Sequence, residues 1–209
     1  MKLIFIKGII GNYGTKVLIE DKYKELSKYF NKEFLQKVIN DLNGGANPPL
    51  FIECKKINFD IFEKSVIDKE KIKKGGLLAA LWKICSRNNF GVEYSLVNVP
   101  LNQGTIEISN FFDLNPYRLL TENAEIVAID GDICGVTTFE NFELTFDNSD
   151  NLLKNSYENN KSNTKNFYYL GKITNNRKRI RIDNDIESYL TKDFKDEVDK
   201  VIPNLTKNI

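Results

Sequence analysis

The sequence predicts one domain of the α/β class (α+β layered), in which helices pack on a mixed β-sheet. The length of 209 residues suits a single domain, expected to span residues 1–209. Hydrophobic residues make up 41% of the chain, with 14 Phe and 9 Tyr among them, which is enough to fill a core. Short runs with the pattern of strands are interleaved with stretches in which apolar residues recur every three or four positions, as in helices.

The N-terminal part begins with a strand and continues with helices. Residues 2–7 alternate in polarity and predict a strand that runs into a glycine-rich turn. Residues 15–39 follow the helical period, and residues 32–40 predict a separate helix with Asn31 as its N-cap. The Gly-, Asn- and Pro-rich residues 43–49 predict a loop.

The middle of the chain contains the clearest helix. Another helix is predicted before it, over residues 60–69. The pair Gly75-Gly76 opens the clearest helix, which ends near residues 88–89 and precedes a strand over residues 92–97. The apolar face of this helix consists of Leu77, Leu78, Leu81, Ile84 and Cys85.

Helices and strands continue to alternate after this point. Residues 104–112 predict a helix, and residues 115–117 start a short helix with Pro at its first turn. Residues 125–129 and 136–146 are extended and are separated by a turn at residues 130–132.

The last part of the chain changes in composition. Residues 147–166 are rich in Asn, Ser and Lys and predict a flexible insertion. Residues 167–173 and 177–182 predict the two strands of a hairpin. An acidic, amphipathic tail follows over residues 183–201.

Charge and composition exclude several classes of partner. Lys and Arg total 30 against 29 Asp and Glu, so a formal charge of +1 gives no global field that would gather nucleic acid, and a nucleic-acid partner is not expected. No apolar run approaches the ~18 residues of a membrane span, and the N-terminus lacks a signal-peptide pattern. We therefore expect a cytoplasmic protein with no membrane partner.

Histidine is absent, which removes Ser-His and Cys-His nucleophiles and histidine metal sites. The three cysteines, Cys54, Cys85 and Cys134, form no CxxC pair, so no metal site is expected. Cys85 lies on the apolar helix face, which favours a buried structural thiol over a reactive one.

The segment K-G-G-L-L-A-A-L-W-K-I at residues 74–84, followed by V-E-Y at residues 92–94, resembles a motif of the aminoimidazole-ribonucleotide-synthetase-related superfamily. In that superfamily a D-P-T-x-G-G turn leads into a helix and then a strand. Selenophosphate synthetase, thiamine-monophosphate kinase and the hydrogenase-maturation dehydratase are members. Further segments similar to the superfamily follow its order along the chain, at residues 8–15, 115–124, 169–174 and 192–198.

The resemblance implies the fold of the C-terminal domain of aminoimidazole-ribonucleotide synthetase. The family's N-terminal domain brings an acidic Gly-Asp-Asp segment that holds metal ions on ATP, and these 209 residues contain no counterpart. Residues 71–73 read K-I-K instead of D-P-T, and Asn123 stands where the family has Gly. We therefore expect the isolated chain to be inactive and to hold no cofactor; ATP and Mg would bind only if a partner supplied the other domain.

The resemblance also implies association. Because the family's C-terminal domains pack one face against the N-terminal domain, we expect either a homodimer or a partner chain that resembles that domain.

The glycine pair at the start of the clearest helix is the best candidate site. The amides of Gly75 and Gly76 and the positive end of the helix dipole favour an anion. Lys73 and Lys74, with Lys71 nearby, would add charge for a phosphate or sulfate. The alternative is that the glycines only permit a tight turn and close packing, with the lysines solvated.

Three further features have a functional and a structural interpretation. Gly11 and Gly14 belong to a G-x-x-G-x-x-G run, which either cradles a phosphate or turns the chain into the first helix; it is not the dinucleotide fingerprint. The basic run at residues 177–181 either contacts phosphate or protects an edge strand. The carboxylates Asp113, Glu122 and Glu125 are either acid/base groups or, as we favour, surface charges.

The sequence therefore predicts a domain that is not catalytic alone and binds a phosphorylated small molecule. The alternative is the substrate-binding subunit of an ATP-dependent enzyme whose ATP-binding half lies on another chain or outside this sequence. A third hypothesis is a nucleic-acid module that uses the basic run.

Overall fold

The computed structural model describes residues 1–43, 56–57, 65–132, 136–140, 143–146, 167–183 and 186–208. In chain order the elements are β1 (Lys2–Lys7), α1 (Asn12–Asp21), α2 (Tyr23–Leu26), α3 (Lys32–Leu42), β2 (Lys56–Ile57), β3 (Val66–Ile72), α4 (Gly76–Asn88), β4 (Gly91–Tyr94), α5 (Gln103–Phe111), η2 (Pro116–Arg118), β5 (Ala124–Asp130), β6 (Val136–Glu140), β7 (Glu143–Phe146), β8 (Phe167–Thr174), β9 (Arg179–Asp183), β10 (Ile186–Tyr189), α7 (Val198–Val201) and η4 (Leu205–Asn208).

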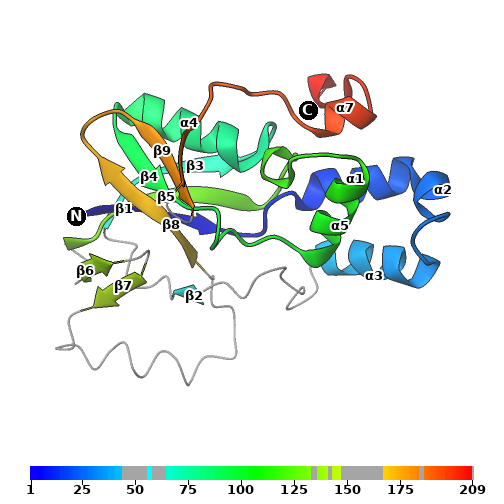
Figure 1. The fold of residues 1–209 in the computed structure, drawn as a ribbon, viewed down its shortest axis with the longest axis horizontal. Coiled ribbons are helices and arrows are strands. Elements are labelled where there is room, and N and C mark those ends of the chain that lie inside the picture. The colour runs from blue at the N-terminus through cyan, green and yellow to red at the C-terminus, as the bar shows by residue number, and fades with distance from the viewer. Residues whose placement is uncertain are drawn as a thin grey trace.

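A mixed sheet forms the centre of the molecule, in the order β10-β9-β4-β8-β1-β5-β3, with β2 also paired to β8 (Figure 1). The strands β4 and β9 are parallel, and the other pairs are antiparallel. The strands β6 and β7 pair with each other. A mixed sheet with packed helices is the predicted fold class, which is confirmed.

The helix α4 lies along one face of the sheet (Figure 1). Its five predicted apolar residues are buried in the cluster that also takes in the sheet residues Ile4, Ile126 and Leu170. The helices α1, α3 and α5 lie beyond one end of the strands around a second cluster, which includes Leu18, Leu35 and Ile108. Asn31 caps α3 as predicted, since its side-chain oxygen accepts from the N–H of Phe34.

The helix predicted over residues 60–69 is wrong for its last four residues, which belong to the strand β3; residues 60–64 lie outside the described part. Burial alternates along β3, which pairs with β5 at the edge of the sheet. A strand at an edge exposes one face to water, and here Asp68 and Glu70 on the less exposed face are charged as well, which conceals the period of two.

The hairpin predicted for residues 167–182 is also wrong, because β4 lies between β8 and β9. The connection at residues 175–178 passes the start of β4, where a Cβ on Gly91 would lie 2.4 Å from the Lys178 carbonyl oxygen. The strand β4 ends at Tyr94, earlier than predicted, and β10 within the acidic tail was not predicted. The insertion predicted at residues 147–166 lies outside the described residues.

Among the helices that the structure describes, none has the length and apolar character required to cross a membrane.

Candidate anion-binding site

The turn between β3 and α4 needs glycine at both of its central positions. Gly75 and Gly76 have φ angles of 76° and 62°, in the left-handed region that favours glycine. A Cβ on Gly76 would lie 2.4 Å from the carbonyl oxygen of Tyr117, so this turn is in close contact with η2. The packing role proposed for the glycines is therefore real, whatever else the turn binds.

The amide of Gly75 has a partner within the chain. It donates to Oδ2 of Asp196 at 2.8 Å, while Oδ1 accepts from the amides of Leu120 and Val198 at 3.1 Å each. Asp196 is 2% exposed, and burial raises the pKa of its carboxyl, with the three amide hydrogen bonds opposing that shift. A carboxylate of the C-terminal segment thus takes the place at Gly75 that an anionic ligand was expected to take.

Gly11, just before α1, and Gly14, in its first turn, contact the loop at residues 120–121. The Gly11 amide donates to Oγ1 of Thr121 at 2.9 Å, and the Gly14 amide donates to the Leu120 carbonyl oxygen at 2.8 Å. A Cβ on Gly14 would lie 2.9 Å from a methyl carbon of Val198. Gly11 and Gly14 therefore join the start of α1 to residues 120–121, and the Gly75-Gly76 turn is linked to Leu120 through Asp196.

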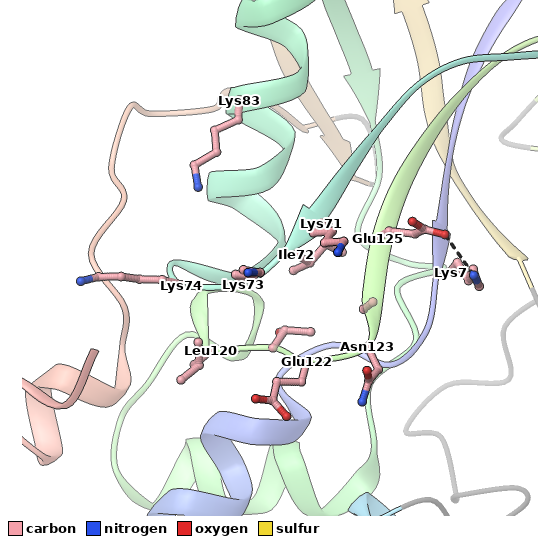
Figure 2. Close-up of a pocket in the computed structure, with 12 residues that line it drawn as sticks. Lys7, Lys71, Ile72, Lys73, Lys74, Lys83, Leu120, Glu122, Asn123 and Glu125 are labelled. Atoms are coloured by element: carbon pink, nitrogen blue, oxygen red, sulfur yellow. Dashed lines mark hydrogen bonds and ion pairs between the residues drawn. The ribbon is translucent and has the colours of Figure 1, made fainter. Parts of the chain in front are cut away.

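A pocket of about 760 Å³ lies beside this loop (Figure 2). Its charged lining residues are Lys7, Lys71, Lys73, Lys74, Lys83, Glu122 and Glu125. Five lysines against two glutamates give the pocket a formal charge of +3. The predicted residues Lys73 and Lys74 thus lie together in a cationic pocket, adjacent to the glycine amides of the turn.

Two of the lysines already have partners. Lys7 Nζ pairs with Glu125 at 3.0 Å, and Lys74 Nζ donates to the Thr206 carbonyl oxygen at 2.7 Å. The side chains of Lys71, Lys73 and Lys83 make no hydrogen bond or ion pair in the part of the chain that the structure describes. These three exposed cations are available to an anion.

Sequence reasoning missed Lys7 and Lys83 as pocket residues. Lys83 lies seven positions after Gly76, which is two turns along the same side of a helix, and this spacing could have identified it. Lys7 reaches the pocket only because β1 pairs with β5 and places it opposite Glu125. Glu122 and Glu125 line the pocket, whereas Asp113 does not.

The basic run lies on a different part of the molecule. The strand β9 lies between β10 and β4, so the interpretation of this run as edge protection is wrong. The Arg179 guanidinium carbon lies 4.1 Å from the centre of the Trp82 ring, and Arg181 pairs with Asp183. Cys85 is buried as predicted, and burial raises the pKa of its thiol to about 11, although Arg179 opposes the shift.

No protein-family model matches the chain, and the search of curated proteins found no match. Solved structures do match it. E. coli HypE, a hydrogenase maturation protein, aligns with a TM-score of 0.54 and 11% identity over 94% of this chain and 51% of that chain. HypE in a HypE–HypF complex aligns with a TM-score of 0.53 and 12% identity, over 91% of this chain and 52% of that chain. HypE in complex with ATP aligns with a TM-score of 0.53 and 11% identity, over 91% of this chain and 50% of that chain.

The chain spans about half the length of the HypE chains that it matches. At this level of identity the likeness concerns the fold alone. The resemblance predicted from residues 74–84 and the other segments is confirmed at that level, since a hydrogenase maturation protein shares the fold.

Proposed function

We propose that this chain is a binding domain for a small phosphorylated anion, held in the lysine pocket, and that it is not catalytic by itself. The observation that supports this most is the group of three lysines, Lys71, Lys73 and Lys83, whose charges have no partner in the described part of the chain. A phosphate group would neutralise them with charge-assisted hydrogen bonds.

The site differs from the amide cradle expected at the glycines. The amides of Gly11, Gly14 and Gly75 donate their hydrogen bonds to groups within the chain. Lysine side chains would therefore supply the contacts to the ligand. Lysine binds as a flexible point charge, unlike the planar guanidinium of arginine. Such a site selects ligands by charge more than by shape.

A melting-temperature series tests the proposal. Phosphate or sulfate should raise the melting temperature by mass action on the native state, whereas chloride at matched ionic strength should not. An equal response to all three anions would show a general salt effect and would refute a specific site.

A second candidate function is the substrate-binding subunit of an ATP-dependent enzyme. The fold shared with about half of HypE favours it, since HypE has been solved with ATP and in a complex with HypF. The first proposal expects no micromolar binding of Mg-ATP to the isolated chain, because the described residues contain no group of three or more Asp, Glu, His or Cys side chains that could hold the metal on the phosphates. Calorimetry that finds such binding would favour the second function.

Association is part of both proposals, as a homodimer or with a partner chain. The strand β10 lies at the edge of the sheet and leaves Ile186 and Tyr189 71% and 68% exposed. Sedimentation across a concentration series should show a dimer that Ile186→Lys weakens if β10 is the contact. A cytoplasmic location stays a prediction.

A further inference from the structure

The pocket has two walls that are far apart in sequence. One is formed by residues 71–74, which lead into the turn at Gly75, and the other is the loop at residues 120–123. Asp196 accepts from the Gly75 amide, next to the first wall, at 2.8 Å and from the Leu120 amide, in the second wall, at 3.1 Å. The C-terminal segment that carries Asp196 runs past Lys74 in Figure 2.

We infer that Asp196 is a positioning residue for the pocket: its carboxylate fixes the separation of the two walls and thereby couples docking of the C-terminal segment to anion binding. This inference rests on the proposed function of the pocket.

The geometry of the carboxylate supports a positioning role. One oxygen accepts from Gly75, beside the first wall, and the other from Leu120 in the second, so moving either wall away from the carboxylate would lengthen and weaken a hydrogen bond. Asp196 is 2% exposed, which leaves water little access to the amides if the carboxylate is removed.

The same segment is attached at further points. Lys74 Nζ, from one wall, donates to the Thr206 carbonyl oxygen at 2.7 Å. Arg118, two residues before Leu120, donates to the Asp193 carbonyl oxygen at 3.0 Å and pairs with its carboxylate at 3.1 Å. Asp196 therefore lies between two anchors, each adjacent to one of the walls.

Coupling between the segment and the ligand is reciprocal. If a docked segment favours anion binding, a bound anion must favour docking by the same free energy. Pyrophosphate should then slow amide hydrogen exchange in residues 191–207, although none of them lines the pocket.

The variant Asp196→Asn tests the inference. It keeps the volume of the side chain but replaces one accepting oxygen with an N–H₂ group, which is itself a donor and cannot accept from a backbone amide. Asp68→Asn is the matched control, since it makes the same substitution at a carboxylate beside the other end of α4 and Asp68 does not line the pocket. The two variants are measured in the full chain by calorimetric titration with pyrophosphate and by hydrogen exchange. Should Asp196→Asn fail to fold, Asp196→Glu keeps the charge and alters the spacing by one methylene.

The expected result is that the Asp196 variant binds pyrophosphate at least tenfold more weakly and exchanges faster in residues 73–76 and 120–123, whereas Asp68→Asn changes neither. Equal pyrophosphate affinity in wild type and the Asp196 variant would overturn the inference. If the wild type does not bind pyrophosphate, the proposed function and the coupling both fail, and exchange then tests only whether Asp196 holds the two walls in place. Faster amide exchange in residues 73–76 and 120–123 of the Asp196 variant would support this positioning role, and unchanged exchange there would refute it.

Discussion

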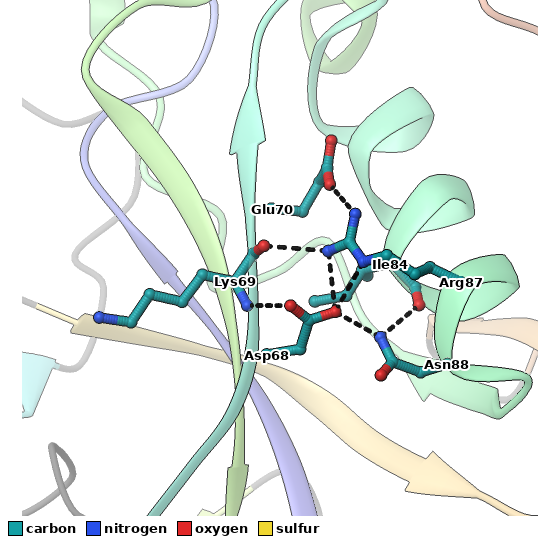
Figure 3. A network of polar contacts seen from close by, with 6 residues as sticks. All are labelled: Asp68, Lys69, Glu70, Ile84, Arg87 and Asn88. Carbon is teal, nitrogen blue, oxygen red and sulfur yellow. Dashed lines mark hydrogen bonds and ion pairs between the residues drawn. The ribbon is translucent and has the colours of Figure 1, made fainter.

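The two ends of α4 are held by different kinds of polar contact. At its N-terminus one buried carboxylate, Asp196, accepts from three backbone amides. At its C-terminus Arg87 pairs with Asp68 at 2.8 Å and Glu70 at 2.6 Å and donates to the Lys69 carbonyl oxygen at 3.0 Å (Figure 3).

Both ends join α4 to the rest of the fold, yet they should contribute unequally to stability. Exposed ion pairs are screened by water and salt and contribute about 0–1 kcal/mol each. Removing a buried acceptor leaves amides without partners, at about 1–3 kcal/mol per group. Burial, more than the number of contacts, therefore decides how much each network contributes to the free energy of unfolding.

The largest effect should come from placing alanine at a position of positive φ at the N-terminal end of α4, compared with the same change at its C-cap. Gly76→Ala combines a positive φ with a contact of 2.4 Å to the Tyr117 carbonyl oxygen, so the variant should lose most of its stability. Asn89→Ala, at the C-cap with φ 58°, should lose only about 1–2 kcal/mol, the cost of a left-handed alanine. Urea denaturation of both variants checks this order, and equal losses would contradict the close packing of the turn.

Asp196→Ala should have the next largest effect. It leaves the amides of Gly75, Leu120 and Val198 without their acceptor, and we expect a loss of about 2–4 kcal/mol in the free energy of unfolding. Chemical denaturation at neutral pH measures it. A loss below about 1 kcal/mol would place Asp196 in the same class as an exposed ion pair.

Arg87→Ala should cost no more than about 1 kcal/mol, and less as salt rises, because Arg87 is exposed and its partners are screened. Unfolding in low salt and in about 1 M NaCl tests this, since the Debye length falls to about 3 Å at the higher concentration. A large loss that is insensitive to salt would reverse the comparison between the two ends.

The smallest effect is a difference in pH dependence. Burial raises the pKa of Asp68, but the hydrogen bonds from Asn88, Arg87 and the Lys69 amide outweigh burial and hold that pKa below its ordinary value of 3.8. A lowered pKa in the folded state means that Asp68 stabilises the fold above pH 3.8 and that this contribution is lost as pH falls through the folded pKa.

Asp196 should behave in the opposite way. Burial raises the pKa of its carboxyl, so its contribution is greatest below pH 3.8 and declines as pH rises through the folded pKa. Acidification should therefore shrink the stability difference between wild type and Asp68→Asn but not that between wild type and Asp196→Asn. Parallel pH profiles for the two variants would contradict the opposite shifts.

The helices and central strands were predictable because their patterns are local. The period of apolar residues reaches along all of α4, and residues 125–129 form an apolar run within β5. The strand β3 was mistaken for a helix because Asp68, Lys69 and Glu70 are charged on both sides of the strand. The hairpin was predicted wrongly because β4, which is distant in sequence, pairs between β8 and β9, and no local pattern indicates such long-range pairing.

The candidate site was predictable only where sequence neighbours form it. Lys73 and Lys74 adjoin the glycines and were identified, whereas Lys7 comes from a strand far away in the chain. No local pattern distinguishes Asp196, in an acidic tail, from its neighbours Asp193 and Asp199. Its role at the turn follows from contacts with residues 121 and 76 positions away.

Calorimetric titration with pyrophosphate of the wild type and two double variants tests the central claim, the lysine pocket, most directly. Lys73→Ala/Lys83→Ala removes two pocket cations, and Lys28→Ala/Lys37→Ala removes the same charge from exposed positions elsewhere. We predict that only the pocket variant loses affinity, by about tenfold or more, which is about 1.4 kcal/mol. No binding to the wild type, or equal weakening in both variants, would contradict the claim.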